Sequence, residues 1–169
     1  MSDSTLLVSL RCYPHGYPVS AQARSDVFAV TETDIEDLVA RVARLESDDA
    51  YLEHQGRPRY IDPDDGEEAG DHVMYLTVAG RWAYLRYIGP IVGAAEISGI
   101  PVVPLGDPIS PETHGTNNID YVAGSGVSLR AAEQALQEFL ATGELPRNIR
   151  WVLEADLEAG PIHVLKRGA

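Results

Sequence analysis

Five histidines and one cysteine are the side chains of this sequence that most readily bind a metal ion or attack a substrate. No two histidines are two to five positions apart, and they stand at His15, His54, His72, His114 and His163. A zinc site on one helix or hairpin needs ligands at such short spacings. Cys12 falls in an apolar run that predicts a buried strand, where a thiol is usually inert. The sequence therefore predicts no metal and no other cofactor.

A serine between two glycines is the nearest approach to a nucleophile. Ser125 lies in GSGVS, but Gly124 and Gly126 flank it directly, which breaks the G-x-S-x-G spacing of a nucleophile elbow. The stretch also lacks the glycine spacing and lysine of a phosphate-binding loop. A turn that leads into the following helix is the favoured interpretation.

Carboxylates paired with one another or with histidine are the remaining catalytic candidates. Glu154, Asp156 and Glu158 alternate in EADLE, and in a strand they would form one solvated face. His114 with Asp107, in a long loop rich in glycine and proline, could form a histidine–carboxylate pair. We expect no enzyme, and a small enzyme built on that pair stays open as an alternative.

Acidic side chains dominate the composition, with 26 Asp and Glu against 13 Lys and Arg and a formal charge of −13. This balance argues against binding to nucleic acid or to anionic lipid, and it suits a basic protein partner. A charge that only keeps the protein soluble is the alternative. The strongest concentration has no basic residue within it and consists of Asp62, Asp64, Asp65, Glu67, Glu68 and Asp71. We expect an acidic binding surface there, and a solvated loop with no partner is the alternative.

Residues 72–88 give the clearest hairpin signal, because two runs of period two flank a turn expected at Ala79 and Gly80. One predicted face is aliphatic and core-like: Met74, Leu76, Val78, Ala83, Leu85 and Tyr87. The opposite face is aromatic with polar tips: Val73, Tyr75, Thr77, Trp82, Tyr84 and Arg86. Aromatic residues and arginine are favoured at interface hot spots, so this face is a candidate binding surface. A second small core beneath the long loops is the alternative.

Two helices are predicted to position these surfaces. Thr33 and Glu36 form a capping box for a helix over 34–46, and Ser128 and Gly143 mark the two ends of a second helix. Residues 56–71 are predicted as loop. The predicted strands cover 5–13, 26–30, 72–78, 82–88, an edge strand at 100–105, 119–126 and short segments in IRWVLEADL and GPIHVLKRG. The pattern predicts an α+β fold: a mostly antiparallel sheet with two main helices on one face, in a single domain over 1–169.

The N-terminus and the hydrophobicity of the chain suggest where the protein resides. MSDSTLLVSLRCY lacks the basic start and the long apolar core of a signal peptide. No run approaches the length of a membrane span, and one cysteine allows no internal disulfide. We therefore expect a cytoplasmic protein.

The segment ALQEFLATGELPRNIRW has a specific order of residues: an A-L-x-E-F-L-x-T-G-x-x-P helix end followed by a tryptophan. The matching positions are Ala135, Leu136, Glu138, Phe139, Leu140, Thr142, Gly143, Pro146 and Trp151. Together with the hairpin MYLTVAGRWAYLRYIG, it resembles the first family of bacterial polymorphic-toxin immunity proteins. The resemblance leaves out the N-terminal third and residues 89–118, and its positions are structural, so it carries no catalytic residue onto this chain.

What the resemblance implies is an immunity protein, often encoded beside a deaminase-type toxin that acts on nucleic acid. We expect such a protein to bind its cognate toxin and cover the active site. The acidic side chains would form the rim. The expected anchors are Tyr75, Trp82, Tyr84, Asn117, Asn118 and Tyr121, with Arg86 beside them. An adaptor for a non-toxin partner is the alternative from another class.

Overall fold

The structure is a computed structural model that describes residues 4–12, 23–44, 49–115 and 119–159. Its strands are β1 (Leu6–Cys12), β2 (Ala23–Ala29), β3 (Asp49–His54), β4 (Arg59–Ile61), β5 (Glu68–Gly70), β6 (Val73–Ala79), β7 (Trp82–Ile88), β8 (Val102–Pro104), β9 (Thr113–His114), β10 (Asp120–Tyr121), β11 (Val127–Ser128) and β12 (Trp151–Leu153). Its helices are α1 (Glu32–Ala43), α2 (Leu129–Thr142) and α3 (Glu154–Ala159), with a short 3-10 helix η2 (Ala95–Ile97).

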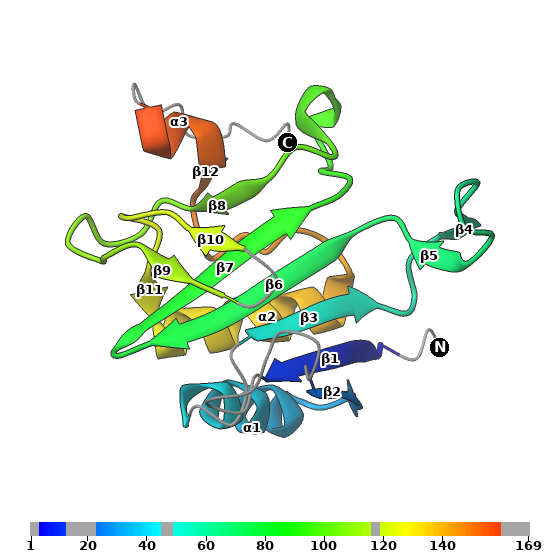
Figure 1. Cartoon of the computed structure of the whole chain (residues 1–169), viewed down its shortest axis with the longest axis horizontal. Coiled ribbons are helices and arrows are strands. Elements are labelled where there is room, and N and C mark those ends of the chain that lie inside the picture. The colour runs from blue at the N-terminus through cyan, green and yellow to red at the C-terminus, as the bar shows by residue number, and fades with distance from the viewer. Residues whose placement is uncertain (1–3, 13–22, 45–48, 116–118, 160–169) are drawn as a thin grey trace.

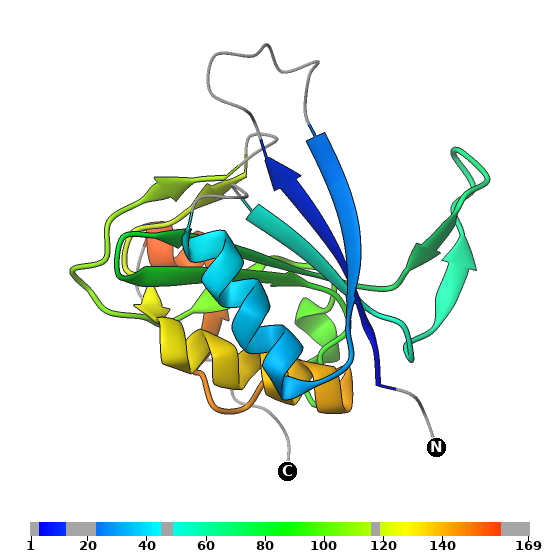
Figure 2. The ribbon, with the colours of Figure 1, turned by 90° about the horizontal axis from the view of Figure 1, so that it is seen from below.

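One large antiparallel sheet organises the molecule, in the strand order β12-β8-β7-β6-β3-β1-β2 (Figure 1). β11 also pairs with β7, whereas β4–β5 and β9–β10 form separate two-stranded ribbons. Figure 2 shows α1 and α2 on one face of the sheet and the β9–β10 ribbon over the other, with the β4–β5 ribbon projecting at the side. The expected α+β fold, with two main helices on one face of an antiparallel sheet, is confirmed.

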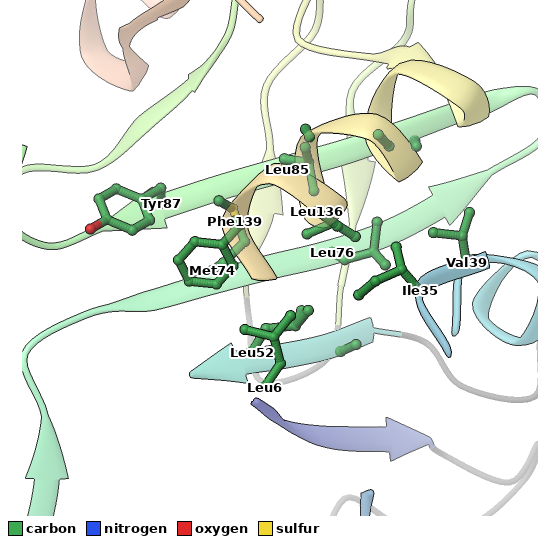
Figure 3. Close-up of a cluster of buried hydrophobic side chains, with 14 of the residues drawn as sticks. Leu6, Ile35, Val39, Leu52, Met74, Leu76, Leu85, Tyr87, Leu136 and Phe139 are labelled. Carbon is green, nitrogen blue, oxygen red and sulfur yellow. The ribbon is translucent and has the colours of Figure 1, made fainter. Parts of the chain in front are cut away.

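The hydrophobic core lies between this sheet and its two helices (Figure 3). Ile35 and Val39 of α1 and Leu136 and Phe139 of α2 are fully buried against it. The sheet contributes the aliphatic face predicted for the hairpin, and every one of its members is buried: Met74, Leu76, Val78, Ala83, Leu85 and Tyr87. Because one face of each of these helices and one face of the sheet are apolar, α1 and α2 pack on the same side of the sheet.

The hairpin faces are confirmed, but the expected turn position is wrong. Ala79 pairs with Trp82, so the two turn residues are Gly80 and Arg81. Gly80 has a φ of 61°, which a two-residue hairpin turn requires at this position and glycine adopts without strain. The shift changes each pairing partner by two positions, so every side chain keeps the face that was predicted.

The first helix begins two residues earlier than predicted. Thr31 is its N-cap, and the capping box joins Thr31 to Asp34 rather than Thr33 to Glu36. The Thr31 side chain accepts a hydrogen bond from the Asp34 backbone at 3.1 Å, and the Asp34 carboxylate accepts from the Thr31 backbone at 2.9 Å. The sequence TETDIE contains two overlapping boxes, and the aspartate of the first also accepts the backbone N–H of Val30. This additional bond favours the earlier start.

The second helix begins and ends where the sequence predicted. Ser128 accepts the backbone N–H of Ala131 at 3.1 Å, and Gly143 ends the helix with a φ of 68°. Both signals act through neighbouring backbone groups, so they need no distant partner.

Several strand predictions need correction. β3 was not predicted, although it lies between β1 and β6 near the middle of the sheet. The expected edge strand at 100–105 is β8, which has β7 on one side and β12 on the other. The expected strand at 119–126 reduces to β10 in a separate ribbon, and the predicted loop at 56–71 contains β4 and β5. EADLE is helical in α3 rather than extended.

Some predictions concern residues outside the described ranges: the turn PHGYP, the segment GPIHVLKRG, and Asn117 and Asn118. The side chain of Cys12 is likewise not described. Within the described ranges, no helix combines the length and the hydrophobicity needed to cross a membrane.

Candidate functional site

The sheet face opposite α1 and α2 divides into a covered part and an open part. The covered part contains Tyr84 and Tyr121, whose rings lie 6.1 Å apart and have no exposed surface. The Tyr84 hydroxyl donates to the Pro111 carbonyl at 2.6 Å, and burial raises the pKa of both phenols. These two predicted anchors lie in a small internal cluster, so they present no contact area in this conformation.

The open part of this face contains Tyr51, Tyr75 and Arg86. The two tyrosine rings meet edge to face at 4.6 Å, and the Arg86 guanidinium lies 5.6 Å from the centre of the Tyr75 ring. Arg86 donates to both carboxylate oxygens of Glu154, at 2.6 and 3.3 Å. Glu154 had been placed on a solvated strand face; instead, α3 brings it to β7, and it holds the Arg86 side chain over the sheet.

Trp82 lies at the end of this face, beside the hairpin turn. Its indole ring is partly exposed, and the Arg81 guanidinium is 4.5 Å from the ring centre. The backbone of Trp82 pairs with Ser128, and a Cβ on Gly126 would lie 3.1 Å from the Cβ of Trp82. The strand and the close Gly126 backbone therefore fix the base of a side chain whose ring remains accessible.

We use the name acidic hairpin for residues 59–70, which comprise β4, β5 and their turn. The carboxylate of Asp62 accepts the backbone N–H of Asp64 at 2.9 Å, and that of Asp65 accepts the N–H of Glu67 at 2.8 Å. These bonds order the turn before any partner arrives. The five acidic residues at its tip and in β5 are thus held together on a projecting ribbon (Figure 1).

Two large side chains on the acidic hairpin are exposed, which the sequence did not predict. Tyr60 is 50% exposed and Ile61 is 65% exposed. The only sequence signal was RYI, which was interpreted as part of a loop. A large exposed apolar side chain beside a cluster of charges is the composition expected of an anchor and its rim.

A groove of about 280 Å³ lies where the acidic hairpin meets the open sheet face. It is lined by Leu7, Ser9, Tyr51, Glu53, Arg59, Glu68 and Val73. Arg59 donates to Glu68 at 2.9 Å and more weakly to Glu53 at 3.5 Å, which connects the hairpin to β3 across the groove.

Asp71 does not belong to the exposed rim, because it anchors the base of the acidic hairpin. Arg57 donates to its two carboxylate oxygens, both at 3.0 Å, and also to the Gly143 carbonyl at 3.1 Å. Burial alone would raise the pKa of the Asp71 carboxyl, but the hydrogen bonds from Arg57 and His72, together with the charge of Arg57, lower it. Since Gly143 ends α2, the acidic hairpin is tied to the helix that carries the sequence signature.

Two buried histidines complete this connection. His72 accepts the backbone N–H of His54 through Nε2 at 2.8 Å, and its Nδ1 lies 2.8 Å from Asp71. His54 accepts the Gly56 N–H through Nδ1, and its Nε2 reaches the Leu140 carbonyl at 2.9 Å. In each ring one nitrogen accepts a backbone proton, so the neutral ring satisfies all of these bonds.

Stability is expected to decrease as the pH falls below about 6.5, because burial lowers the pKa of His72 relative to the unfolded chain. Between the two pKa values the unfolded state binds more protons, so the free energy of unfolding rises with pH. Urea unfolding from pH 7 to 5 measures this slope. His72→Gln should cost about 1–3 kcal/mol at pH 7 and flatten the slope. In the control His114→Gln the slope should not flatten, because the hydrogen bond with Asp120 raises the pKa of His114 and gives it the opposite pH dependence. Equal slopes in both variants would contradict this origin.

Gly143→Ala is expected to destabilise the fold by about 1–2 kcal/mol, because its φ of 68° is unfavourable for a residue with a Cβ. The added Cβ would also lie 3.2 Å from the Arg57 and His54 side chains. Gly99→Ala is the matched control, since Gly99 has a φ of 81° and no neighbour within 4 Å of the added atom. Urea midpoints compare the two, and an equal loss would show that contact with Arg57 and His54 contributes nothing.

The remaining signature residues also have structural roles. Glu138 accepts the backbone N–H groups of Arg147 and Asn148, at 2.9 and 3.4 Å, and so orders the turn after α2. The buried Trp151 indole donates to the Pro146 carbonyl at 2.8 Å. These contacts agree with the interpretation of the signature as scaffold.

The candidates for catalysis are not brought together. His114 is exposed and lies 2.6 Å from Asp120, whereas Asp107 accepts the backbone N–H of Ile109 at 3.0 Å. Ser125 is buried and donates to the Val122 carbonyl, as the predicted turn requires. Across residues 4–12, 23–44, 49–115 and 119–159, no group of three His, Cys, Asp or Glu residues could hold a metal ion.

Comparison with known proteins gives one family. The family model described as Immunity protein Imm1 matches residues 23–153, which include most of the N-terminal third and the 89–118 segment that the signature left out. Searches of curated proteins and of solved structures gave no match. The family match spans every strand from β2 to β12, both main helices and the acidic hairpin, with β1 outside it, and the chain belongs to the Imm1 family of immunity proteins.

Proposed function

We propose that this chain neutralises a toxin with nucleic-acid deaminase activity by covering the toxin's active site with the acidic hairpin and the open sheet face. Membership of the Imm1 family gives the coarser role, since an immunity protein acts on a cognate toxin as a non-enzymatic inhibitor. The observation that carries the finer proposal is the acidic hairpin, a preordered and exposed ribbon beside an aromatic sheet face.

The chemistry of a nucleic-acid deaminase explains why such a surface would inhibit it. The enzyme needs a basic channel that guides the strand and a pocket that accepts the target base. A ribbon with five carboxylates can occupy the channel in place of the phosphates. Direct competition for the channel follows, because the two polyanions cannot occupy it together.

The anchors are expected where side chains are both large and accessible. Tyr75 and Trp82 on the sheet face are partly exposed, and Tyr60 and Ile61 on the acidic hairpin are exposed. Tyr84 and Tyr121 are assigned to support the overlying segment, and Arg86 keeps Tyr75 in position. Asn117 and Asn118, which follow β9, are retained from the sequence as polar contacts.

Immunity requires the complex to outlast many encounters with substrate. A specific interface buries about 800 Å² on each partner. The length of β6 from the groove to the hairpin turn, seven residues, spans roughly 23 Å at 3.3 Å per residue, which fits a contact of that size. Both ends of the open face can therefore contact one toxin domain. We place this encounter in the cytoplasm.

The direct experiment is to co-express this chain with the product of the adjacent gene, to test for copurification, and to assay deamination of single-stranded DNA and RNA. A stable complex without deaminase activity is expected. An adaptor for another partner predicts no toxin gene next to this one and no copurification. Copurification with full residual toxin activity would contradict the proposed inhibition.

A further inference from the structure

We infer that the groove between the acidic hairpin and β3 binds one arginine side chain of the toxin. The inference rests on the proposed function and makes it more specific, because it names the chemical group that the open face receives. The groove is lined by two carboxylates, an aromatic ring and aliphatic side chains from three strands of the sheet and from the acidic hairpin.

The walls of the groove carry more negative than positive charge. Glu53 and Glu68 both line it, and Arg59 is the cation that both of them share. The Arg59 contact to Glu68 is a good hydrogen bond at 2.9 Å, whereas the contact to Glu53 at 3.5 Å is long for a charged pair. A second guanidinium could complete the neutralisation of Glu53.

The aromatic and aliphatic lining of the groove favours a planar cation. Tyr51 lines it, and the edge of one ring of the Tyr51–Tyr75 pair meets the face of the other. Leu7 and Val73 supply aliphatic surface for the methylene groups of a long side chain. A cation over an aromatic ring is attracted by the ring quadrupole, and the attraction grows when the site is shielded from water.

The size of the groove suits one long side chain. Its volume of about 280 Å³ exceeds the space of several water molecules, each of which takes about 30 Å³ in the liquid. Arginine matches the groove better than lysine, because its flat group stacks on rings and bonds carboxylates in pairs.

The backbone holds the two walls at a fixed separation. A Cβ on Gly70 would lie 3.4 Å from the Glu53 carboxylate, so the base of the acidic hairpin packs directly against Glu53. Asp71, the next residue, is fixed by Arg57. A wall that is ordered before binding loses little conformational entropy when the guest side chain enters.

The first test uses the isolated protein and needs no toxin. Backbone amide resonances are followed by NMR while N-acetyl-arginine-methylamide is added, and the citrulline analogue serves as the neutral control of the same shape. We expect saturable shifts around Tyr51, Glu53 and Val73 with the arginine compound alone, at concentrations up to about 100 mM. Equal shifts with the citrulline compound, or none at the groove, overturn the inference.

Variants then assign the shifts to the carboxylates. Glu53→Gln should remove them, and Glu133→Gln on α2, which is similarly half-buried, should leave them unchanged. Thermal unfolding monitored by circular dichroism checks each fold. If Glu53→Gln unfolds the protein, Glu68→Gln takes its place with the same expectation. Shifts that persist in a folded Glu53→Gln or Glu68→Gln variant contradict the assignment.

The second test uses the toxin complex and double-mutant cycles. Each arginine of the toxin domain is changed to alanine and combined with Glu53→Gln, and dissociation rates are measured. For one arginine, the effect of the double substitution on the dissociation rate should differ at least tenfold from the product of the two single effects. Replacing that arginine by lysine should recover only part of the residence time. Tight binding without an arginine that is coupled to Glu53 overturns this inference but leaves the proposed function intact. Absence of any complex overturns the proposed function. In that case the NMR titration still tests whether the groove binds an arginine side chain.

Discussion

Reversing two charges on the acidic hairpin, Asp64→Lys with Glu67→Lys, is expected to slow association with the toxin about 10- to 100-fold. Both side chains are exposed, and no side-chain hydrogen bond or ion pair within the described residues holds either of them. Electrostatic attraction acts mainly on the rate of encounter, so dissociation should change by less than about threefold. Stopped-flow association at low and high salt measures both the rate and its screening.

A second variant carries the same change of net charge elsewhere. Glu36→Lys with Asp37→Lys places it on the exposed side of α1, the helix face of the molecule. Association of this control should slow by no more than about threefold, because charges far from the interface contribute little at physiological salt. Equal slowing in both variants would mean that overall charge, rather than the acidic hairpin, attracts the toxin.

Trp82→Ala is expected to leave the protein folded and to speed dissociation of the toxin about 30-fold or more, the size of a hot-spot effect. Trp82 is only partly buried, and the guanidinium of the exposed Arg81 lies 4.5 Å from the centre of its ring. Surface plasmon resonance gives the dissociation rate, and circular dichroism gives the melting temperature. If the variant is folded and its dissociation rate is unchanged, Trp82 is not part of the interface.

The companion variant is Tyr84→Phe, which removes the hydroxyl that donates to Pro111 from a fully buried ring. It should lower stability by about 0.5–1.5 kcal/mol and leave dissociation unchanged. If Trp82→Ala instead unfolds the protein, the indole belongs to the core, and the expectation for Trp82 is wrong.

The parts of the fold that the sequence predicted well depend on neighbouring residues. The ends of α2 follow from Ser128 and Gly143, which act on backbone groups within one turn. The two hairpin faces follow from the period of two, which survives the wrong turn position. Local signals of this kind are available without knowledge of the tertiary structure.

The missed features depend on contacts between distant parts of the chain. β3 was overlooked because DAYLEH is short and polar, and its buried His54 gains a partner only at the end of α2, 86 residues later. Asp71 was assigned to the rim because Arg57 and Gly143 had no visible relation to it. EADLE alternates like a strand, but α3 turns Glu154 toward Arg86. Long-range pairs such as these override local pattern.

Likewise, the candidate site was only partly predictable. The charge of the acidic hairpin was evident, whereas its order, its groove and the exposure of Tyr60 and Ile61 required the structure. Tyr84 and Tyr121 are buried because the β9–β10 ribbon and the segment at Pro111 cover this part of the sheet. The alternation of residues in β7 predicts the face on which Tyr84 lies, but not what covers that face.

The most direct measurement is the inhibition of toxin-catalysed deamination at several concentrations of single-stranded nucleic acid. If this protein occupies the strand channel, the apparent inhibition constant rises linearly with the substrate concentration, from below to above the KM of the toxin. An inhibition constant that stays the same at every substrate concentration would contradict occlusion, because inhibitor and substrate would then be bound to the toxin together.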